Sequence, residues 1–309
     1  MTDSAIRIAT RSSKLALWQA EYIKSLIAEC SPETPVEIVH IKTVGDQNQT
    51  DALREFGGTG VFTREVQTSV LSGDTDIAVH SLKDLPTLES SGLALAGVPD
   101  RAPRFDALLL PDGKNIESLD QLPNGSRVGT GSPRRQAQLL YVRDDLQMLE
   151  IRGNVETRIR KLDQGEYDAI ILAEAGLRRL ELGRRISFQL CPPFVFPAVG
   201  QGAIGIECRD DDERVLEVLR TFTNDDVLAV VTAERALLAE LRAGCHAPLG
   251  VLCELADGQL ELQAVLLSQD GKTRLESSAS GRREDPIEVG VAAARRLLEK
   301  GGDGLVDAV

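Results

Sequence analysis

The chain has 309 residues, which is enough for two or three domains whose cores fold without disulfides or structural metals. Its hydrophobic content of 42% is ordinary for a globular protein, and no apolar run approaches the roughly 20 residues that a membrane-spanning helix needs. The formal net charge of −13 argues against general binding to nucleic acid or to an anionic membrane.

The N-terminus and the cysteines indicate the cytoplasm. Residues 1–13 show neither the apolar core nor the small-residue cleavage site of a secretory signal. The five cysteines are odd in number, widely spaced and without a CxxC pair, which argues against a disulfide framework and favours a reducing compartment. The three histidines lie far apart in sequence, so we expect no metal site.

The first hundred residues predict alternating strands and helices. Strands are expected at 6–10, 36–44 and 75–81, and helices at 14–30 and 61–73. The short apolar runs LALAGVP and DALLLP follow, each ending at a proline. Strand, helix and strand with short connections predict βαβ units and a mostly parallel sheet.

The pattern restarts after Pro111. Residues 126–132 predict a strand entering a Gly/Ser turn, and residues 133–143 predict a helix that Ser132 caps. The βαβ pattern repeats in the segments LQMLEI, NVETRIRKLDQG and YDAIILAEAG. It ends near the proline-rich stretch at 191–200, which we interpret as a hinge. A strand is expected at 203–209.

The final third predicts a small antiparallel α+β domain. An amphipathic helix at 225–244 precedes three alternating runs, which Asp257-Gly258 and Asp270-Gly271 divide. Asp-Gly between alternating apolar runs is a good hairpin signal. A helix from Pro286 to Lys300 follows, and no internal repeat is apparent along the sequence.

Arginines gather in one segment of this acidic chain. Residues 127–160 contain seven arginines and four acids, a net charge of +3, so the remainder of the chain carries −16. In GTGSPRRQ, Arg134 and Arg135 fall in the first turn of the helix that Ser132 caps. RGNVETR repeats the arrangement, with Arg152 and Arg158 around the start of the next helix. Helix N-termini bind anions, and paired arginines there favour a ligand with several carboxylates or phosphates. The alternative is a solvated helix face.

VHSLKDLP places His80, Ser81, Lys83 and Asp84 at the end of a strand, where open α/β folds bind ligands. Asp84 beside Lys83 is either a surface ion pair or a site carboxylate that stabilises a developing cation, and its position favours the second. GGTG at 57–60 is either a lid or a connection.

Two further motifs have competing interpretations. GQGAIG at 200–205 matches GxGxxG, but the alternating residues after it predict a strand where the dinucleotide fingerprint needs a helix. Cys245, in LRAGCHAPLG, follows a long helix. An isolated cysteine is usually a small buried apolar residue, and the residues around Cys245 do not by themselves decide its role.

Taken together, RIATRSSKLALWQA, HSLKDLP, GTGSPRRQ, RGNVETR, PAVGQGAIGIECR, TAERALL and GCHAPLG resemble the porphobilinogen deaminase (hydroxymethylbilane synthase) family. The matches run in order from about Arg7 to Gly250. The resemblance implies an α/β fold of two periplasmic-binding-protein-like lobes with mostly parallel sheets, plus a small C-terminal α+β domain with an antiparallel sheet. The expected boundaries are 1–100 with 200–222 for the first lobe, 101–199 for the second, and 223–309 for the C-terminal domain.

The resemblance also implies a reaction. Four porphobilinogen molecules condense stepwise, each losing ammonia, onto a dipyrromethane cofactor that Cys245 holds through a thioether. Water then releases hydroxymethylbilane. Asp84 matches the catalytic aspartate of the family. The implied partners are porphobilinogen and the growing polypyrrole chain, with no nucleic acid or membrane, and the implied oligomeric state is a monomer.

The matching positions divide into two groups. The implied cofactor-binding residues are Cys245, Arg134, Arg135, Lys83, Ser132 and Asp84. The implied substrate-binding residues are Arg11, Gln19, Ser81, Arg152, Arg158, Arg179 and Arg235. Departures from the family pattern are Thr59, where many relatives carry lysine, and Lys14, Phe105, Gly131 and Pro133.

Two other classes remain as alternatives. A non-catalytic two-lobed polycarboxylate-binding protein would use the same arginine helix ends without needing Cys245 or Asp84. A nucleotide-dependent oxidoreductase would rest on GQGAIG alone.

Overall fold

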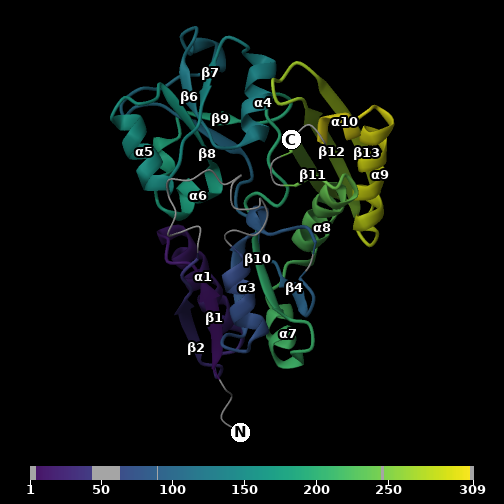
Figure 1. Cartoon of the computed structure of the whole chain (residues 1–309). Coiled ribbons are helices and arrows are strands. Elements are labelled where there is room, and N and C mark those ends of the chain that lie inside the picture. The colour runs from purple at the N-terminus through teal and green to yellow at the C-terminus, as the bar shows by residue number, and fades with distance from the viewer. Residues whose placement is uncertain (1–4, 44–62, 89, 245–246, 307–309) are drawn as a thin grey trace. The chain divides into compact units, whose positions relative to one another are not determined.

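The computed structural model describes residues 5–43, 63–88, 90–244 and 247–306 (Figure 1). Thr59 and the rest of the GGTG segment, as well as Cys245 and His246, lie outside the described residues. The chain divides into two compact units. The first comprises Met1–Ala102 and Ala203–Ala229, and the second comprises Pro103–Gly202 and Val230–Val309.

The expected strands and helices are present, most of them within a few residues of the predicted ends. The strands are β1 (Ile6–Thr10), β2 (Val36–His40), β3 (Ile77–Ser81), β4 (Leu93–Gly97), β5 (Asp106–Leu109), β6 (Arg127–Gly129), β7 (Gln147–Leu149), β8 (Ala169–Ala173), β9 (Phe188–Leu190), β10 (Ile204–Arg209), β11 (Leu249–Ala256), β12 (Gln259–Leu267) and β13 (Arg274–Arg282). The α-helices are α1 (Lys14–Cys30), α3 (Arg64–Leu71), α4 (Pro133–Val142), α5 (Val155–Asp163), α6 (Glu174–Arg179), α7 (Glu213–Arg220), α8 (Asp225–Glu240), α9 (Pro286–Glu299) and α10 (Asp303–Val306). Short 3-10 turns include η2 (Leu82–Asp84).

The sheet of the first unit has the strand order β2-β1-β3-β10-β4. β1 pairs in parallel with β2 and β3, as the βαβ pattern predicts, whereas β10 is antiparallel to both β3 and β4. The mixed α/β class is confirmed, and in this sheet β10 alone runs opposite to the other strands. β10 enters the sheet after the chain returns from the second unit, so no βαβ crossover fixes its direction.

The second unit contains a five-stranded sheet with the corresponding order, β7-β6-β8-β5-β9. β6 is parallel to β7 and β8, and β5 is antiparallel to β8 and β9. Each unit therefore has a parallel trio next to an antiparallel strand. The two sheets share this topology although no repeat is apparent in the sequence.

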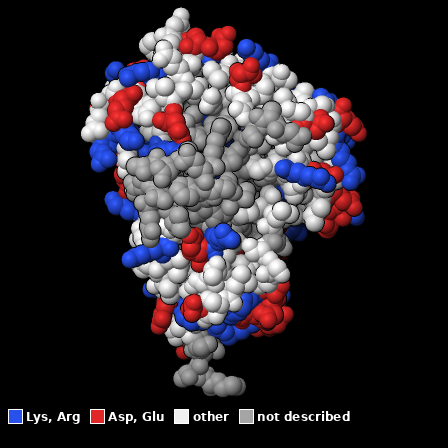
Figure 2. Space-filling model, in the orientation of Figure 1, with Lys and Arg blue, Asp and Glu red and all other residues white. Residues whose placement is uncertain are grey.

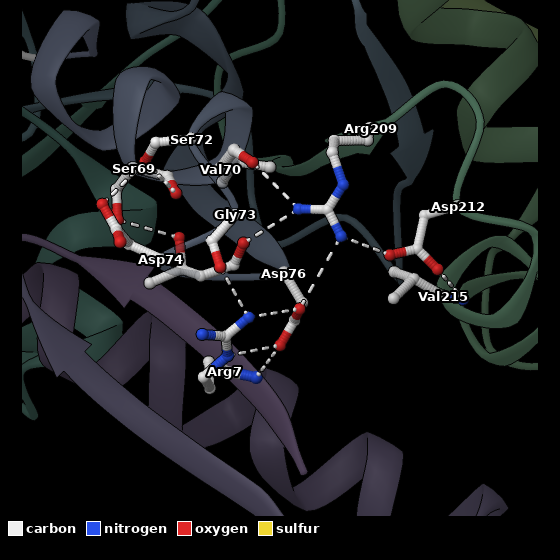
Figure 3. Close-up of polar contacts among 11 residues, drawn as sticks. Arg7, Ser69, Val70, Ser72, Gly73, Asp74, Asp76, Arg209, Asp212 and Val215 are labelled. Atoms are coloured by element: carbon white, nitrogen blue, oxygen red, sulfur yellow. Dashed lines mark hydrogen bonds and ion pairs between the residues drawn. The ribbon is translucent and has the colours of Figure 1, made fainter. Parts of the chain in front are cut away.

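A polar clasp with the same atoms occurs in both units. At the start of β1, the Arg7 side chain donates from Nε and Nη2 to Asp76, and from Nη2 to the Gly73 carbonyl oxygen at 2.8 Å (Figure 3). At the start of β6, Arg127 makes the same bonds to Asp168 and to the Gly165 carbonyl oxygen at 3.0 Å. Arg7 is the second residue of β1 and Arg127 is the first residue of β6. The aspartate immediately precedes β3 in the first unit and β8 in the second.

The C-terminal strands form a separate antiparallel sheet, β11-β12-β13. Asp257 and Gly258 lie in the first hairpin turn, both with positive φ, and Gly271 takes φ +73° in the second, as the Asp-Gly signals predict. Apolar side chains of α8 and α9 pack with this sheet into one buried cluster. The small α+β arrangement is confirmed.

YDAIILAEAG, expected to form a strand, divides into β8 and the short helix α6. No helix in the described part of the chain combines the length and the apolar character of a membrane span.

Candidate functional site

A pocket in the first unit lies at the carboxyl ends of β1 and β3. Ten residues line it: Arg11, Ser13, Leu15, Ala16, Gln19, Thr63, Val79, His80, Ser81 and Asp84. These residues come from the loop after β1, the first turns of α1, the start of α3, the end of β3 and the η2 turn. The end of a strand is where open α/β folds bind ligands. The structure therefore brings together four of the sequence-predicted residues: Arg11, Gln19, Ser81 and Asp84.

Local structure holds this wall of the pocket in place. Ser13 caps α1 by accepting a hydrogen bond from the backbone nitrogen of Ala16 at 3.2 Å. The buried amide of Gln19 donates to the Ser81 hydroxyl at 2.8 Å. Because Gln19 is fixed by burial in α1, it orients the Ser81 hydroxyl at the end of β3.

Asp84 ends the η2 turn with an exposed side chain. Leu82, in the same turn, is buried, and its backbone nitrogen donates to the Ala203 carbonyl oxygen at 3.0 Å. The turn is thus anchored next to the strand end while Asp84 faces the pocket. A carboxylate in this place can stabilise a cation that develops on a bound ligand.

In the second unit, Arg134 and Arg135 bind one buried carboxylate. Arg134 Nη1 lies 2.7 Å from Asp106 Oδ2, and Arg135 Nη2 lies 2.8 Å from Asp106 Oδ1. The three residues are 5%, 6% and 1% exposed, respectively. Burial alone would raise the pKa of Asp106, but the charges and hydrogen bonds of the two arginines hold it well below its usual range.

The same two guanidinium groups also bind backbone carbonyl oxygens. Arg134 Nη1 donates to Phe196 at 2.6 Å, and Arg135 Nη1 donates to Ile171 at 3.0 Å. Gln201 donates to Asp106 Oδ1 at 2.9 Å. Sequence analysis missed Asp106, whose only signal is an acid that opens an apolar strand. Arg134 and Arg135 therefore bind a carboxylate of the chain itself, Asp106, in addition to any ligand that they bind.

The caps predicted for both arginine-bearing helices are present. Ser132 Oγ accepts from the Arg135 backbone nitrogen, and Asn154 Oδ1 accepts from the Thr157 backbone nitrogen at 2.9 Å. Pro133 stands at the first position of α4, where the lost N–H costs nothing. A Cβ at Gly131 would lie 3.3 Å from the Ile151 carbonyl oxygen, so glycine eases a tight approach there.

The remaining predicted arginines of the second unit differ in burial. Arg152 and Arg158 are half-buried; Arg152 contacts Glu150, and Arg158 Nε donates to the Gly153 carbonyl oxygen at 2.8 Å. Arg179 is buried and donates to the Gly202 carbonyl oxygen at 2.8 Å. Arg152 and Arg158 are therefore more accessible to a ligand than the buried Arg179.

Arg235 is half-buried on α8, next to Glu234, and Lys83 is half-buried in the η2 turn. The buried carboxylate of Glu234 accepts from the Gly200 backbone nitrogen at 2.8 Å. This bond ties α8 to the loop that contains GQGAIG. Residues after that loop form β10 and not a helix, so the dinucleotide interpretation of the motif is excluded.

No group of three or more His, Cys, Asp or Glu residues suited to a metal ion occurs within the described ranges. Taken together, the fold and the site define an α/β protein with a carboxylate-bearing pocket in one unit and arginine-bearing helix starts in the other. Guanidinium groups at capped helix starts suit an anionic ligand.

Comparison with known proteins identifies the family. A family model described as "Porphobilinogen deaminase, dipyromethane cofactor binding domain" matches residues 6–217, and one described as "Porphobilinogen deaminase, C-terminal domain" matches residues 228–299. A protein named porphobilinogen deaminase from Syntrophotalea carbinolica is 41% identical over 309 residues, which cover 100% of this chain and 97% of the relative. The chain belongs to the porphobilinogen deaminase family.

Solved structures with similar folds are more distant. The methionine-binding protein MetQ aligns with a TM-score of 0.46 and 15% identity over 72% of this chain and 92% of its own. The VFT2 domain of BvgS from Bordetella pertussis aligns with a TM-score of 0.42 and 16% identity over 74% of this chain and 92% of its own.

Proposed function

We propose that this chain catalyses the stepwise head-to-tail condensation of four porphobilinogen molecules, with loss of ammonia, and the hydrolytic release of hydroxymethylbilane in tetrapyrrole biosynthesis. The observation that carries the proposal is the 41% identity to a porphobilinogen deaminase along the whole chain. The pocket that contains Asp84 supports it, because the reaction needs a carboxylate beside a developing cation.

The proposal includes a covalent dipyrromethane cofactor on Cys245. One matched family model is described as a dipyrromethane cofactor binding domain. Pyrroles of this type carry carboxylates, and the side chains at the starts of α4 and α5, including Ser132 and Arg152, are donors that suit them. When bound, the cofactor would supply the free pyrrole α-carbon that the first porphobilinogen unit joins, and each later unit would join the unit added before it. Arg134, Arg135 and Lys83 would bind its carboxylates.

Asp84 is the proposed catalytic residue. When the aminomethyl nitrogen of porphobilinogen leaves as ammonia, positive charge develops on the pyrrole ring. An ionised Asp84 in the pocket lowers the energy of that charge and accepts a hydrogen bond from the pyrrole N–H. The η2 turn fixes the carboxylate before the substrate arrives, so no reorganisation is needed during the reaction.

The substrate's acetate and propionate groups require cations and polar donors. Arg11, Gln19 and Ser81 are the proposed donors in the first unit, all of them lining the pocket with Asp84. Arg152, Arg158, Arg179 and Arg235 are the proposed donors in the second unit. Arginine suits this task because its planar fork binds a carboxylate through two hydrogen bonds.

The whole protein is proposed to be a cytoplasmic monomer with three domains: 1–100 with 200–222, 101–199, and 223–309. The three separate sheets support this division. Sedimentation should give a mass near the 33.4 kDa of one chain, and a stable dimer would contradict it.

The direct test is to incubate the purified full-length protein with porphobilinogen and to follow its consumption, together with the release of ammonia and of hydroxymethylbilane. We expect all three in a ratio of four porphobilinogen and four ammonia to one product. Tight binding of porphobilinogen without consumption would favour the alternative, a polycarboxylate-binding protein.

A further inference from the structure

His80 and Glu207 form a buried pair of titratable groups that has no role in the scheme above. His80 lies on β3, one residue before its end, and Glu207 lies on the neighbouring antiparallel strand β10. Both side chains are 5% exposed, and His80 Nε2 lies 3.1 Å from Glu207 Oε2. The distance is that of an ion pair, although the angle departs from that of an aligned hydrogen bond.

Glu207 is held from a second direction. The side-chain nitrogen of Gln67, on α3, donates to both carboxylate oxygens of Glu207 at 3.0 Å. Among the residues that the structure describes, Gln67 and His80 are the side chains that contact this carboxylate. A buried carboxylate is costly unless donors or a cation compensate for the lost water, so the pair favours a proton on the imidazole nitrogen that faces it.

His80 also belongs to the pocket, where it is one of the lining residues together with Asp84. With Nε2 facing the carboxylate, the second ring nitrogen, Nδ1, remains as an acceptor. None of the hydrogen bonds between described residues uses Nδ1. A carboxylate that orients one imidazole nitrogen while the other faces a ligand is the arrangement found in general-base catalysis.

Other charged groups surround this end of the sheet. Arg11 and Lys14 follow β1, Lys83 and Asp84 follow β3, and Glu65 lies in the first turn of α3. From α1, the nearest polar side chain to the strand end is Gln19, which binds Ser81. Of these groups, Glu207 is the one in contact with the imidazole.

We propose that His80, oriented by Glu207, accepts the proton that each condensation releases; this inference rests on the proposed function. The substrate's aminomethyl group reacts in its protonated form, –CH2–NH3+; its C–N bond breaks, and the electron pair leaves on nitrogen as ammonia. A C–C bond forms between the methylene carbon and the α-carbon of the terminal pyrrole. The C–H bond of that α-carbon then breaks, its electron pair restores the aromatic ring, and the proton goes to His80 Nδ1.

The proton balance closes within the same cycle. The imidazolium, which Glu207 contacts, then gives its proton to the ammonia released earlier in the cycle, so each condensation consumes one protonated aminomethyl group and ends with one ammonium ion. Asp84 does not serve this purpose well, because it stabilises the cation only while it remains ionised. The pocket therefore needs two groups with different tasks, a carboxylate for the charge and an imidazole for the proton.

The experiment compares the full-length wild-type protein, carrying its cofactor, with His80→Gln, Glu207→Gln and the control Asp76→Asn. Asp76 is another buried carboxylate of the same unit, paired with Arg7 in the clasp before β3. We expect His80→Gln to lower kcat about 10²-fold or more with little change in KM. We expect Glu207→Gln, which removes the charge of the carboxylate that orients the imidazole, to lower kcat with little change in KM, and the double variant His80→Gln/Glu207→Gln to be no slower than His80→Gln alone. Asp76→Asn should change only the melting temperature.

Two results would overturn the inference: wild-type kcat in folded His80→Gln, or wild-type kcat in folded Glu207→Gln. If His80→Gln does not fold, as judged by circular dichroism, the kcat of Glu207→Gln decides the matter. An inactive wild-type protein would instead contradict the proposed function. The two failures are therefore distinguishable.

Discussion

Asp106 shows how one residue determines the state of two others. Its carboxylate lies between two buried arginines, and it is the charge that makes their burial tolerable. The caps Ser132 and Asn154 could be predicted because a cap is a local pattern. The partnership of Asp106 with Arg134 could not, since the residues are 28 positions apart and only the folded sheet brings them together.

Replacing Asp106 with asparagine should destabilise the protein severely. The change leaves two guanidinium groups buried beside a neutral side chain, and breaking a buried ion pair in this way costs about 3–5 kcal/mol. Urea unfolding of the variant and the wild-type protein at pH 7 measures the loss. A free energy of unfolding within 1 kcal/mol, roughly the range of a surface ion pair, would show that the triad is not structurally important.

Asp84→Asn should remove activity without affecting the fold. The amide keeps the size of the side chain but lacks the negative charge, so kcat should fall about 10²-fold or more while KM changes little. The matched control is Asp74→Asn, an exposed acid of the same unit that accepts a hydrogen bond from Ser72. Equal activity of the two variants would contradict the role of Asp84.

At the scale of elements, the two Arg–Asp clasps show that contacts with similar geometry can contribute differently to the stability of the fold. The same bonds join Arg7 to Asp76 and Arg127 to Asp168. However, the Asp76 side chain is 6% exposed and that of Asp168 is 45% exposed. Arg209 adds a second cation, 3.8 Å from Asp76, and itself binds Asp212 (Figure 3).

We expect Asp76→Asn to cost about 1–3 kcal/mol, since buried donors lose a charged acceptor, and Asp168→Asn to cost less than about 1 kcal/mol. Denaturant unfolding of both variants at pH 7 tests this order. If Asp168→Asn proved the more destabilising, burial would not be what sets the strength of the clasps.

Sequence patterns predict individual helices and strands better than they predict which strands and side chains pair with one another. The periodicity of residues 14–30 and the Asp-Gly turns are local, and the structure has the corresponding helix and hairpins. The direction of β10 was not predictable in this way, because it depends on a connection through the second unit. The contact between Gln67 and Glu207 joins residues 140 positions apart, so no spacing in the sequence indicates it.

At the scale of the whole molecule, the charge is high but distributed. Where Figure 2 shows described residues, basic and acidic side chains lie near one another on the surface. The arginine-rich segment fits this picture, because Arg127, Arg134, Arg135 and Arg143 all bind internal acids. The excess of arginine in this segment therefore serves both the fold and the proposed ligand.

Stability should fall in acid. Burial would raise the pKa of Asp76, but the hydrogen bonds and charge of Arg7 outweigh it and lower the pKa. Hydrogen bonds from Arg127 lower the pKa of Asp168, and Arg134 and Arg135 lower that of Asp106. Each carboxylate stabilises the folded state fully above its unfolded pKa, about 4, and loses this contribution as the pH falls through its lower folded pKa.

We therefore expect the urea midpoint to decrease steadily from about pH 5 downward, as these groups take up protons on unfolding. Unfolding series at successive pH values between 7 and 3 measure the change. A midpoint that stays constant over this range would show that the three carboxylates are not stabilised in the folded protein.

The mass of the protein itself tests the covalent cofactor on Cys245 most directly. The denatured full-length protein should be weighed after incubation with porphobilinogen and then mapped by peptide analysis around Cys245. We expect an excess of two linked pyrrole units on the Cys245 peptide, and none in Cys245→Ser. An unmodified Cys245 after that incubation would contradict the covalent cofactor and would favour a protein that only binds its ligand.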